Sequence, residues 1–216
     1  GTTNQDRTNY FQNVPTTALD TALWMESDRM GHLLGAVTQA ALDEQRGVVQ
    51  NEKRQGENQP YGRSYDQLLQ KLYPKGHPYH HTVIGSMNDL DAASLEDVKN
   101  WFRTWYGPNN AVLVLAGDID LATAKAKVTQ YFGNIPASAS LAAKPPMIAA
   151  RTNSTREVIT DRVSQTCLMR IWNVPQYSSA DVQRLQLFAQ VLGGSRSSRL
   201  DRRLFFGDKL VDRISA

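Results

Sequence analysis

The spacing of apolar and polar residues predicts helices over much of the chain. Apolar residues that share one helical face, beginning with Leu19 and Leu23, predict a helix from about Thr17. The same reasoning predicts helices at about 40–56, 64–73, 121–132 and 180–192, and a short arginine-rich helix at 197–205.

Residues 74–93 contain two prolines and two glycines, so we expect an ordered loop there. After this loop, Ser94 and Asp97 have the spacing of a capping box. They predict the start of a further helix, which ends at Gly107-Pro108.

Other segments are typical of β-strands. Residues 111–116 form a continuous apolar run, Ala-Val-Leu-Val-Leu-Ala, which predicts a central strand buried on both faces. Further strand candidates are 7–11, 156–163, 166–174 and 210–216. Strands mixed with helices, without a strict strand–helix–strand repeat, predict the α+β class, built in layers.

The composition changes to alanine, serine and proline between Asn134 and Ala150, and this change predicts a domain boundary. We expect one domain at 1–140, a linker at 141–150 and a second domain beginning at 151–216. Both ends of the sequence resemble cut ends, so we expect the chain to be an internal piece of a longer protein, here called the parent.

The overall composition is that of a globular protein, with 41% hydrophobic and 21% charged residues among 216. No apolar stretch is long enough to cross a membrane, so we expect no membrane span. The single cysteine, Cys167, lies in an apolar run and is interpreted as a buried small hydrophobe.

The net charge of +3 is unevenly distributed. Residues 1–150 carry 13 basic and 15 acidic side chains, whereas residues 151–216 carry 11 and 6. Four arginines cluster at 196, 199, 202 and 203. They could steer an acidic ligand or form a solvated helix face. Because no aromatic residues are interleaved with them, we expect no nucleic-acid partner.

Candidate chemistry is concentrated in the predicted helix at 40–56. Gln45, Val48, Val49 and Glu52 share one helical stripe, and the two valines indicate burial. A carboxylate on a buried stripe must be paired, protonated or bound to a metal. From the residues alone, a structural role and a metal-ligand role for Glu52 both stay open.

The order and spacing of six motifs resemble the pitrilysin-type zinc metallopeptidases, which include mitochondrial processing peptidase and insulin-degrading enzyme. The motifs extend over most of the chain. They are Thr8-Asn-Tyr-Phe, Arg46-Gly-Val-Val-x-x-Glu52, Gly76-His-Pro-Tyr, Tyr106-x-Pro-Asn, Ala116-Gly-Asp and Gly193-Gly-x-x-x-Ser198-Arg-Leu.

The resemblance implies a zinc site made by an H-x-x-E-H motif on one helix and a glutamate on a later helix. Glu52 matches that later glutamate, so we expect it to be the third zinc ligand of the parent. The sequence contains no H-x-x-E-H motif, so we expect this chain alone to be inactive and to hold no zinc. Gln45 stands where many relatives carry a second glutamate, and we interpret it as a residue that hydrogen-bonds around the metal ligands.

The resemblance also implies a function. We expect the 1–140 segment to be the later two thirds of the zinc-site domain, with layers of helices on an antiparallel or mixed sheet. The parent would hydrolyse unfolded peptides through a zinc-activated water. The alternative is a non-catalytic partner subunit.

Substrate binding by strand addition would involve Gly1, Thr2 and Thr3. We also expect a homodimer or a paired non-catalytic homologous chain, and a bacterial periplasmic or cell-envelope location. His77, His80 and His81 cluster in the predicted loop, where we expect no separate metal site.

Overall fold

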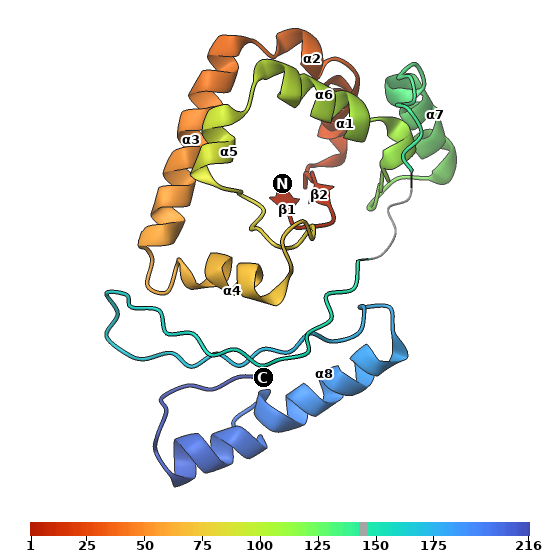
Figure 1. The fold of residues 1–216 in the computed structure, drawn as a ribbon. Helices are drawn as coiled ribbons and strands as arrows, with labels where there is room; N and C mark the ends of the chain where they lie inside the picture. Colours follow the sequence, from red (N-terminus) through yellow and green to blue (C-terminus); the bar gives the residue numbers. More distant parts are fainter. Residues whose placement is uncertain (143–146) are drawn as a thin grey trace. The chain divides into compact units, whose positions relative to one another are not determined.

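The structure is a computed structural model that describes residues 1–142 and 147–216, and it is rich in helix (Figure 1). Its α-helices are α1 (Leu19–Gly31), α2 (Leu33–Ala36), α3 (Gln39–Asn58), α4 (Ser64–Leu72), α5 (Met87–Ala92), α6 (Leu95–Trp105), α7 (Leu121–Phe132) and α8 (Ala180–Gly193). Shorter helical turns are η1 (Thr16–Ala18), η2 (Pro108–Asn110) and η3 (Asp201–Gly207), the last of which is a π-helix.

The sheet of the described residues is a single antiparallel hairpin, β1 (Thr2–Thr3) and β2 (Thr8–Asn9). Thr2 lies opposite Asn9, and Thr3 lies opposite Thr8. The helices at 40–56, 64–73, 121–132 and 180–192 are confirmed to within about two residues.

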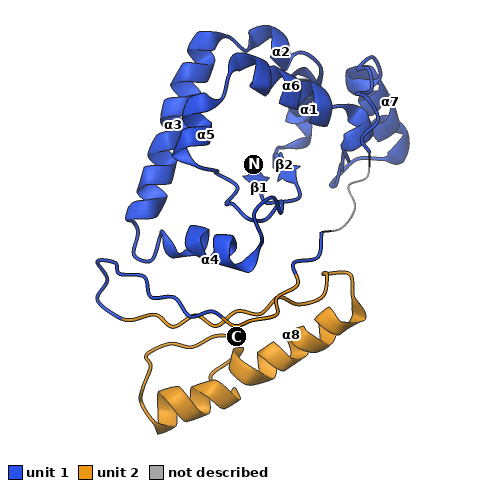
Figure 2. Cartoon of the chain, in the orientation of Figure 1, with its two compact units in different colours: residues 1–149, 155–165 blue, residues 150–154, 166–216 orange. Residues whose placement is uncertain are grey.

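The chain divides into two compact units (Figure 2). The first contains residues 1–149 and 155–165, and the second contains residues 150–154 and 166–216. Residues 143–146 of the predicted linker lie outside the described residues. The domain limits drawn from composition remain predictions.

Polar side chains at helix starts explain where helices begin. Ser94 Oγ accepts a hydrogen bond from the Asp97 amide at 3.1 Å, and the Asp97 carboxylate accepts one from the Ser94 amide at 2.9 Å. This capping box confirms the prediction for α6. The hydrogen bonds from Ser94 also lower the pKa of the Asp97 carboxyl.

The loop predicted at 74–93 is wrong in its last part, because α5 occupies Met87–Ala92. Ser86 caps this helix by accepting a hydrogen bond from the Asp89 amide at 3.1 Å. Ser86 and Asp89 have the same spacing as Ser94 and Asp97, so the signal for this helix was present in the sequence.

Helices α1 and α7 pack against each other in the first unit. Asp20 of α1 accepts hydrogen bonds from Lys127 Nζ at 2.6 Å and from Tyr131 Oη at 3.1 Å on α7. Leu23 of α1 is buried, with 3% of its surface exposed. Among the described residues only Leu23 and Leu69 are buried large apolar side chains. The apolar core of the described chain is therefore small.

The central strand predicted at 111–116 is wrong. Within the described chain, residues 111–116 form neither strand nor helix, and Val112 is 90% exposed. The strands predicted at 156–163, 166–174 and 210–216 are likewise not formed in the described residues. A strand requires backbone hydrogen bonds to a neighbouring strand, and in the described residues these segments form no such ladder. For the same reason Cys167, expected to be buried, is exposed.

Candidate metal and substrate site

One face of helix α3 is fixed by contacts with α5 and the turn after it. Arg46 Nε donates a hydrogen bond to the Leu90 carbonyl at 2.9 Å, and Arg46 Nη2 donates one to the Ala93 carbonyl at 2.6 Å. One helical turn later, Gln50 donates to the Asp91 carboxylate at 2.6 Å. These bonds orient the helix, so the direction of its other side chains follows from helical geometry.

Lys53 continues this packed face, because it lies seven residues after Arg46 and is buried. Its ammonium group pairs with Glu57 Oε1 at 2.9 Å. The prediction that Val48 and Val49 mark the buried stripe is wrong for Val48, which is 52% exposed. The packed side of α3 thus consists of long polar side chains whose heads find partners.

The candidate metal ligand Glu52 lies on a different face of α3. Gln45, Val48 and Glu52 are spaced by three and four residues, and all three are exposed. Within the described part of the chain, the side chains of Glu52 and Gln45 make no hydrogen bond or ion pair. The structure therefore contains an outward-facing stripe with one free carboxylate beside an exposed valine.

Glu52 belongs to no group of three possible metal ligands among the described residues. No such group of histidine, cysteine, aspartate or glutamate side chains occurs elsewhere in the described residues either. A catalytic zinc ion needs three protein ligands, and α3 offers one. Any site that uses Glu52 must draw its other ligands from outside the described residues.

The candidate substrate residues Gly1, Thr2 and Thr3 lie at the start of the hairpin, and Thr2 and Thr3 form β1. Arg7 Nη1 donates a hydrogen bond to Thr2 Oγ1 at 2.9 Å, and Asn4 closes the turn by accepting from the Arg7 amide at 3.0 Å. Within the described chain β1 pairs with β2 alone, so its outer edge is open.

Two tyrosine contacts anchor this hairpin, and sequence analysis missed both. Tyr10 follows β2 directly, and its hydroxyl lies 2.8 Å from that of Tyr106, while Arg29 lies over the Tyr10 ring at 4.3 Å. Burial, and then the bond with Tyr10, raises the pKa of Tyr106 to about 12. Tyr106 belongs to the motif Tyr106-x-Pro-Asn, so the sequence did contain a signal for this residue.

The second anchor joins the hairpin turn to the histidine loop. Tyr79 donates a hydrogen bond to the Asp6 carboxylate, and this bond, followed by burial, raises the pKa of Tyr79 to about 12. Its neighbour His77 is buried, stacks on Tyr73 and accepts a hydrogen bond from the Tyr79 amide at 3.0 Å. The His77 ring therefore has a structural role in holding this loop.

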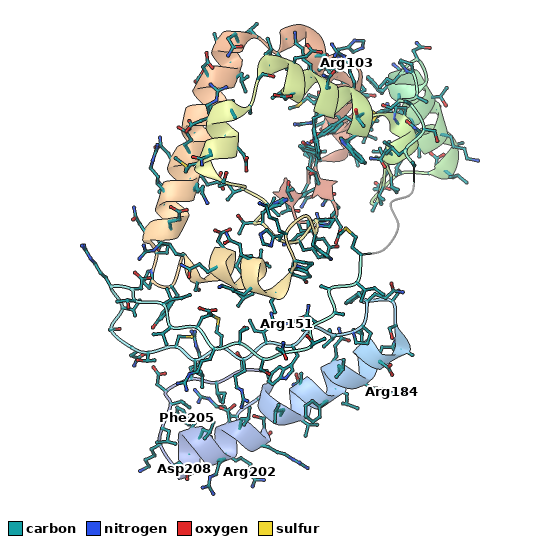
Figure 3. The ribbon with its side chains drawn as sticks, viewed as in Figure 1. Arg103, Arg151, Arg184, Arg202, Phe205 and Asp208 are labelled. Atoms are coloured by element: carbon teal, nitrogen blue, oxygen red, sulfur yellow. The ribbon has the colours of Figure 1, made fainter. Side chains whose placement is uncertain are left out.

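The arginine cluster of the second unit is partly neutralised. Arg196 lies 3.7 Å from Asp201 and over the Phe205 ring, and Arg203 pairs with Asp208 at 2.6 Å. Arg199 and Arg202 have no ion pair with any described residue. Figure 3 shows Arg202 on η3 and Arg184 on α8. The cluster is thus a solvated surface with two free positive charges.

None of the helices in the described residues combines the length and apolarity that crossing a membrane requires.

Comparison with known proteins gives consistent matches. The family described as "Peptidase M16 inactive domain" matches residues 92–216. The Helicobacter pylori protein named zinc protease PqqE is 26% identical over 205 residues, which are 94% of this chain and 46% of that protein.

Two solved structures are similar in fold. A protease from Helicobacter pylori superposes with a TM-score of 0.73 at 22% identity, over 94% of this chain and 49% of that chain. The first half of the periplasmic protease PqqL from Escherichia coli gives a TM-score of 0.50 at 21% identity, over 62% of this chain and 28% of that chain. The chain therefore spans about half the length, or less, of these proteins.

Proposed function

The chain belongs to the peptidase M16 family, and from this membership we propose that its parent is a zinc-dependent endopeptidase that hydrolyses unfolded peptides. A relative over most of this chain is named a zinc protease. In this proposal, residues 1–216 supply one metal ligand and part of the substrate site, and the two histidines and the catalytic glutamate come from outside them.

The exposed carboxylate of Glu52 carries the proposal. It stands on an outward face of α3, free of hydrogen bonds and ion pairs within the described chain, while Arg46 and Lys53 fix the helix from other sides. Glu52 is therefore available to a ligand. Val48 on the same stripe is exposed as well, which favours a face that another part of the parent covers.

The substrate role of Gly1, Thr2 and Thr3 is supported by the open edge of β1. An extended peptide that adds to this edge would bind through its backbone, which tolerates many side chains. This mode fits a peptidase whose substrates are unfolded. A structural strand of the parent is the alternative occupant of this edge. Competition experiments with peptides would distinguish substrate binding from such strand pairing.

A non-catalytic partner subunit is the second candidate, and Gln45 favours it. Its amide lies exposed on the same stripe as Glu52 and cannot act as a base. A parent of this kind would keep the fold and lack peptide hydrolysis. It would associate with a homologous chain that carries the complete zinc site.

The test is peptide hydrolysis by the parent with Glu52→Gln. We expect this change to abolish cleavage of an unstructured fluorogenic peptide, because an amide is a much poorer zinc ligand than a carboxylate. Glu44→Gln is the matched control, since it makes the same charge change at an exposed position of the same helix. Full activity of the Glu52→Gln parent would overturn the assignment, and an inactive wild-type parent would favour the partner-subunit candidate.

For location we propose the bacterial periplasm or cell envelope, on the strength of the likeness to the periplasmic protease PqqL. The parent would act there as a homodimer or beside a homologous chain. Fractionation of cells that express the tagged parent tests the location, and recovery in the cytoplasmic fraction would contradict it.

A further inference from the structure

The hydroxyl of Tyr106 contacts the hairpin at more than one point. It lies 2.8 Å from the hydroxyl of Tyr10, which directly follows β2. The Thr8 side chain, two residues earlier on β2, also hydrogen-bonds to Tyr106 and thereby opposes the rise in its pKa. Thr8 in turn accepts a hydrogen bond from the Thr3 hydroxyl of β1 at 3.3 Å. A chain of hydroxyl groups therefore connects Tyr106 with a candidate substrate residue.

Tyr106 is itself held in place. It is the C-cap of α6, where its amide donates a hydrogen bond to the Phe102 carbonyl at 3.0 Å. Its ring stacks on the Phe102 ring, with centroids 4.3 Å apart and planes inclined by 20°. Burial, followed by the bond with Tyr10, raises the pKa of Tyr106 to about 12, so the hydroxyl keeps its proton at neutral pH. The group can therefore donate one hydrogen bond and accept another at the same time.

The other end of α6 is attached to the helix that carries Glu52. Arg46 of α3 donates a hydrogen bond to the Ala93 carbonyl at 2.6 Å, directly before the Ser94 cap of α6. Helix α6 has 11 residues, which correspond to a length of about 16 Å. Helix α6 thus connects the candidate metal helix at its beginning with the candidate substrate hairpin at its end.

The hairpin has little stability of its own. Each of its strands has two residues, and an isolated hairpin is marginal in water, so its position depends on contacts with other elements. A peptide added to β1 advances by about 3.3 Å per residue. A small shift of the edge therefore changes which peptide bond lies at a fixed metal ion, and misplacement by about 1 Å can cost on the order of 100-fold in rate.

We propose that Tyr106 is a positioning residue that fixes the edge of β1 relative to the helix of Glu52, and so selects which bond of an added peptide is hydrolysed. The inference rests on the proposed function, because it requires a peptide that pairs with β1 beside a zinc ion. Tyr106 acts through Thr8 and Thr3 of the hairpin rather than on the reacting atoms. Loss of its hydroxyl leaves the ring packing intact and frees the hairpin to take several positions.

The test compares the parent with its Tyr106→Phe variant, which keeps the ring that stacks on Phe102 and removes the hydroxyl. A labelled unstructured peptide, titrated with a chelator present to prevent cleavage, should bind about fivefold more weakly by fluorescence anisotropy, the loss expected for one hydrogen bond. Without the chelator, mass spectrometry of the products should show cleavage at additional, neighbouring bonds. Zinc affinity, measured by isothermal titration, should stay unchanged because the metal ligand is on α3.

Further variants separate this role from a general structural one. Tyr10→Phe removes the other hydroxyl of the pair, so the double variant should lose no more than Tyr106→Phe alone. Tyr131→Phe is the matched control, because its hydroxyl bonds to Asp20 between α1 and α7, and its loss should leave peptide binding and products unchanged. Circular dichroism checks that every variant keeps its helices.

The outcomes distinguish this inference from the proposed function. In an active parent, the inference is overturned if Tyr106→Phe leaves peptide binding or the product pattern unchanged, if it lowers zinc affinity, if the losses of the two single variants add, or if Tyr131→Phe has an equal effect. A wild-type parent that binds the peptide without cleaving it would contradict the proposed function, while weaker binding by Tyr106→Phe would still support the inference. A wild-type parent that binds no peptide would contradict both.

Discussion

At the scale of single residues, neighbours on α3 have opposite environments. Lys53 is buried and ion-paired, whereas Glu52 is exposed and free. Sequence analysis expected the valines to mark the buried side of the helix. The long alkyl chains of lysine and arginine can cover apolar surface while their charged groups reach a partner. The packed face of α3 is therefore the one with Arg46 and Lys53. The helix and the place of Glu52 on it were predictable, but the burial of Lys53 was not.

The Tyr79–Asp6 bond gives a prediction at this scale. The pKa of Tyr79 is raised from 10 to about 12, first by its bond to Asp6 and then by burial. Because the folded value exceeds the unfolded one, this stabilisation is complete below about pH 10 and is lost as the pH rises towards 12. Asp6→Asn should shift the titration of one tyrosine back towards pH 10, as measured by phenolate absorbance. Asp28→Asn is the control, and an unchanged titration in Asp6→Asn would refute the bond.

At the scale of elements, helices were predictable and strands were not. The first residues of α6 and α7 are fixed by local side chains. Ser94 and Asp120 each accept a hydrogen bond from the backbone amide three residues later in the chain. The apolar run 111–116 carries the correct pattern for a strand, but a strand depends on residues distant in sequence. Local signals therefore determined the helices, whereas residues 111–116 form no strand in the described chain.

The capping box of α6 gives the prediction at the element scale. Ser94→Ala removes the side-chain acceptor for the Asp97 amide and should lower the free energy of unfolding by about 1 kcal/mol. Ser94→Thr keeps a hydroxyl at the cap and should retain most of that stability. Urea unfolding followed by circular dichroism measures both, and equal stability of all three proteins would show that the cap contributes nothing.

At the scale of the whole molecule, the chain buries few apolar side chains. Leu23 and Leu69 are the buried ones among the described residues, while many large apolar side chains are exposed. Stability and cooperativity depend on buried apolar surface. The family was recognised from the order of motifs, whereas the layers of the predicted α+β class are not formed in the described residues.

Cooperativity gives the prediction at this scale. Because little apolar surface is exposed on unfolding, the urea transition of the 216-residue chain should be broad, with a small dependence of free energy on denaturant. If further segments of the proposed parent cover the exposed faces, the parent should unfold in a steeper transition. A steep, single transition for the 216-residue chain would contradict the thin core seen here.

The central claim is that Glu52 is a zinc ligand of the parent, and isothermal titration with zinc tests it most directly. We predict one tight site in the parent, a large loss of affinity in its Glu52→Gln variant, unchanged binding in Glu44→Gln, and no stoichiometric site in the 216-residue chain, which offers one ligand of the three required. Tight stoichiometric binding by the 216-residue chain, or unchanged affinity in the Glu52→Gln parent, would contradict the account.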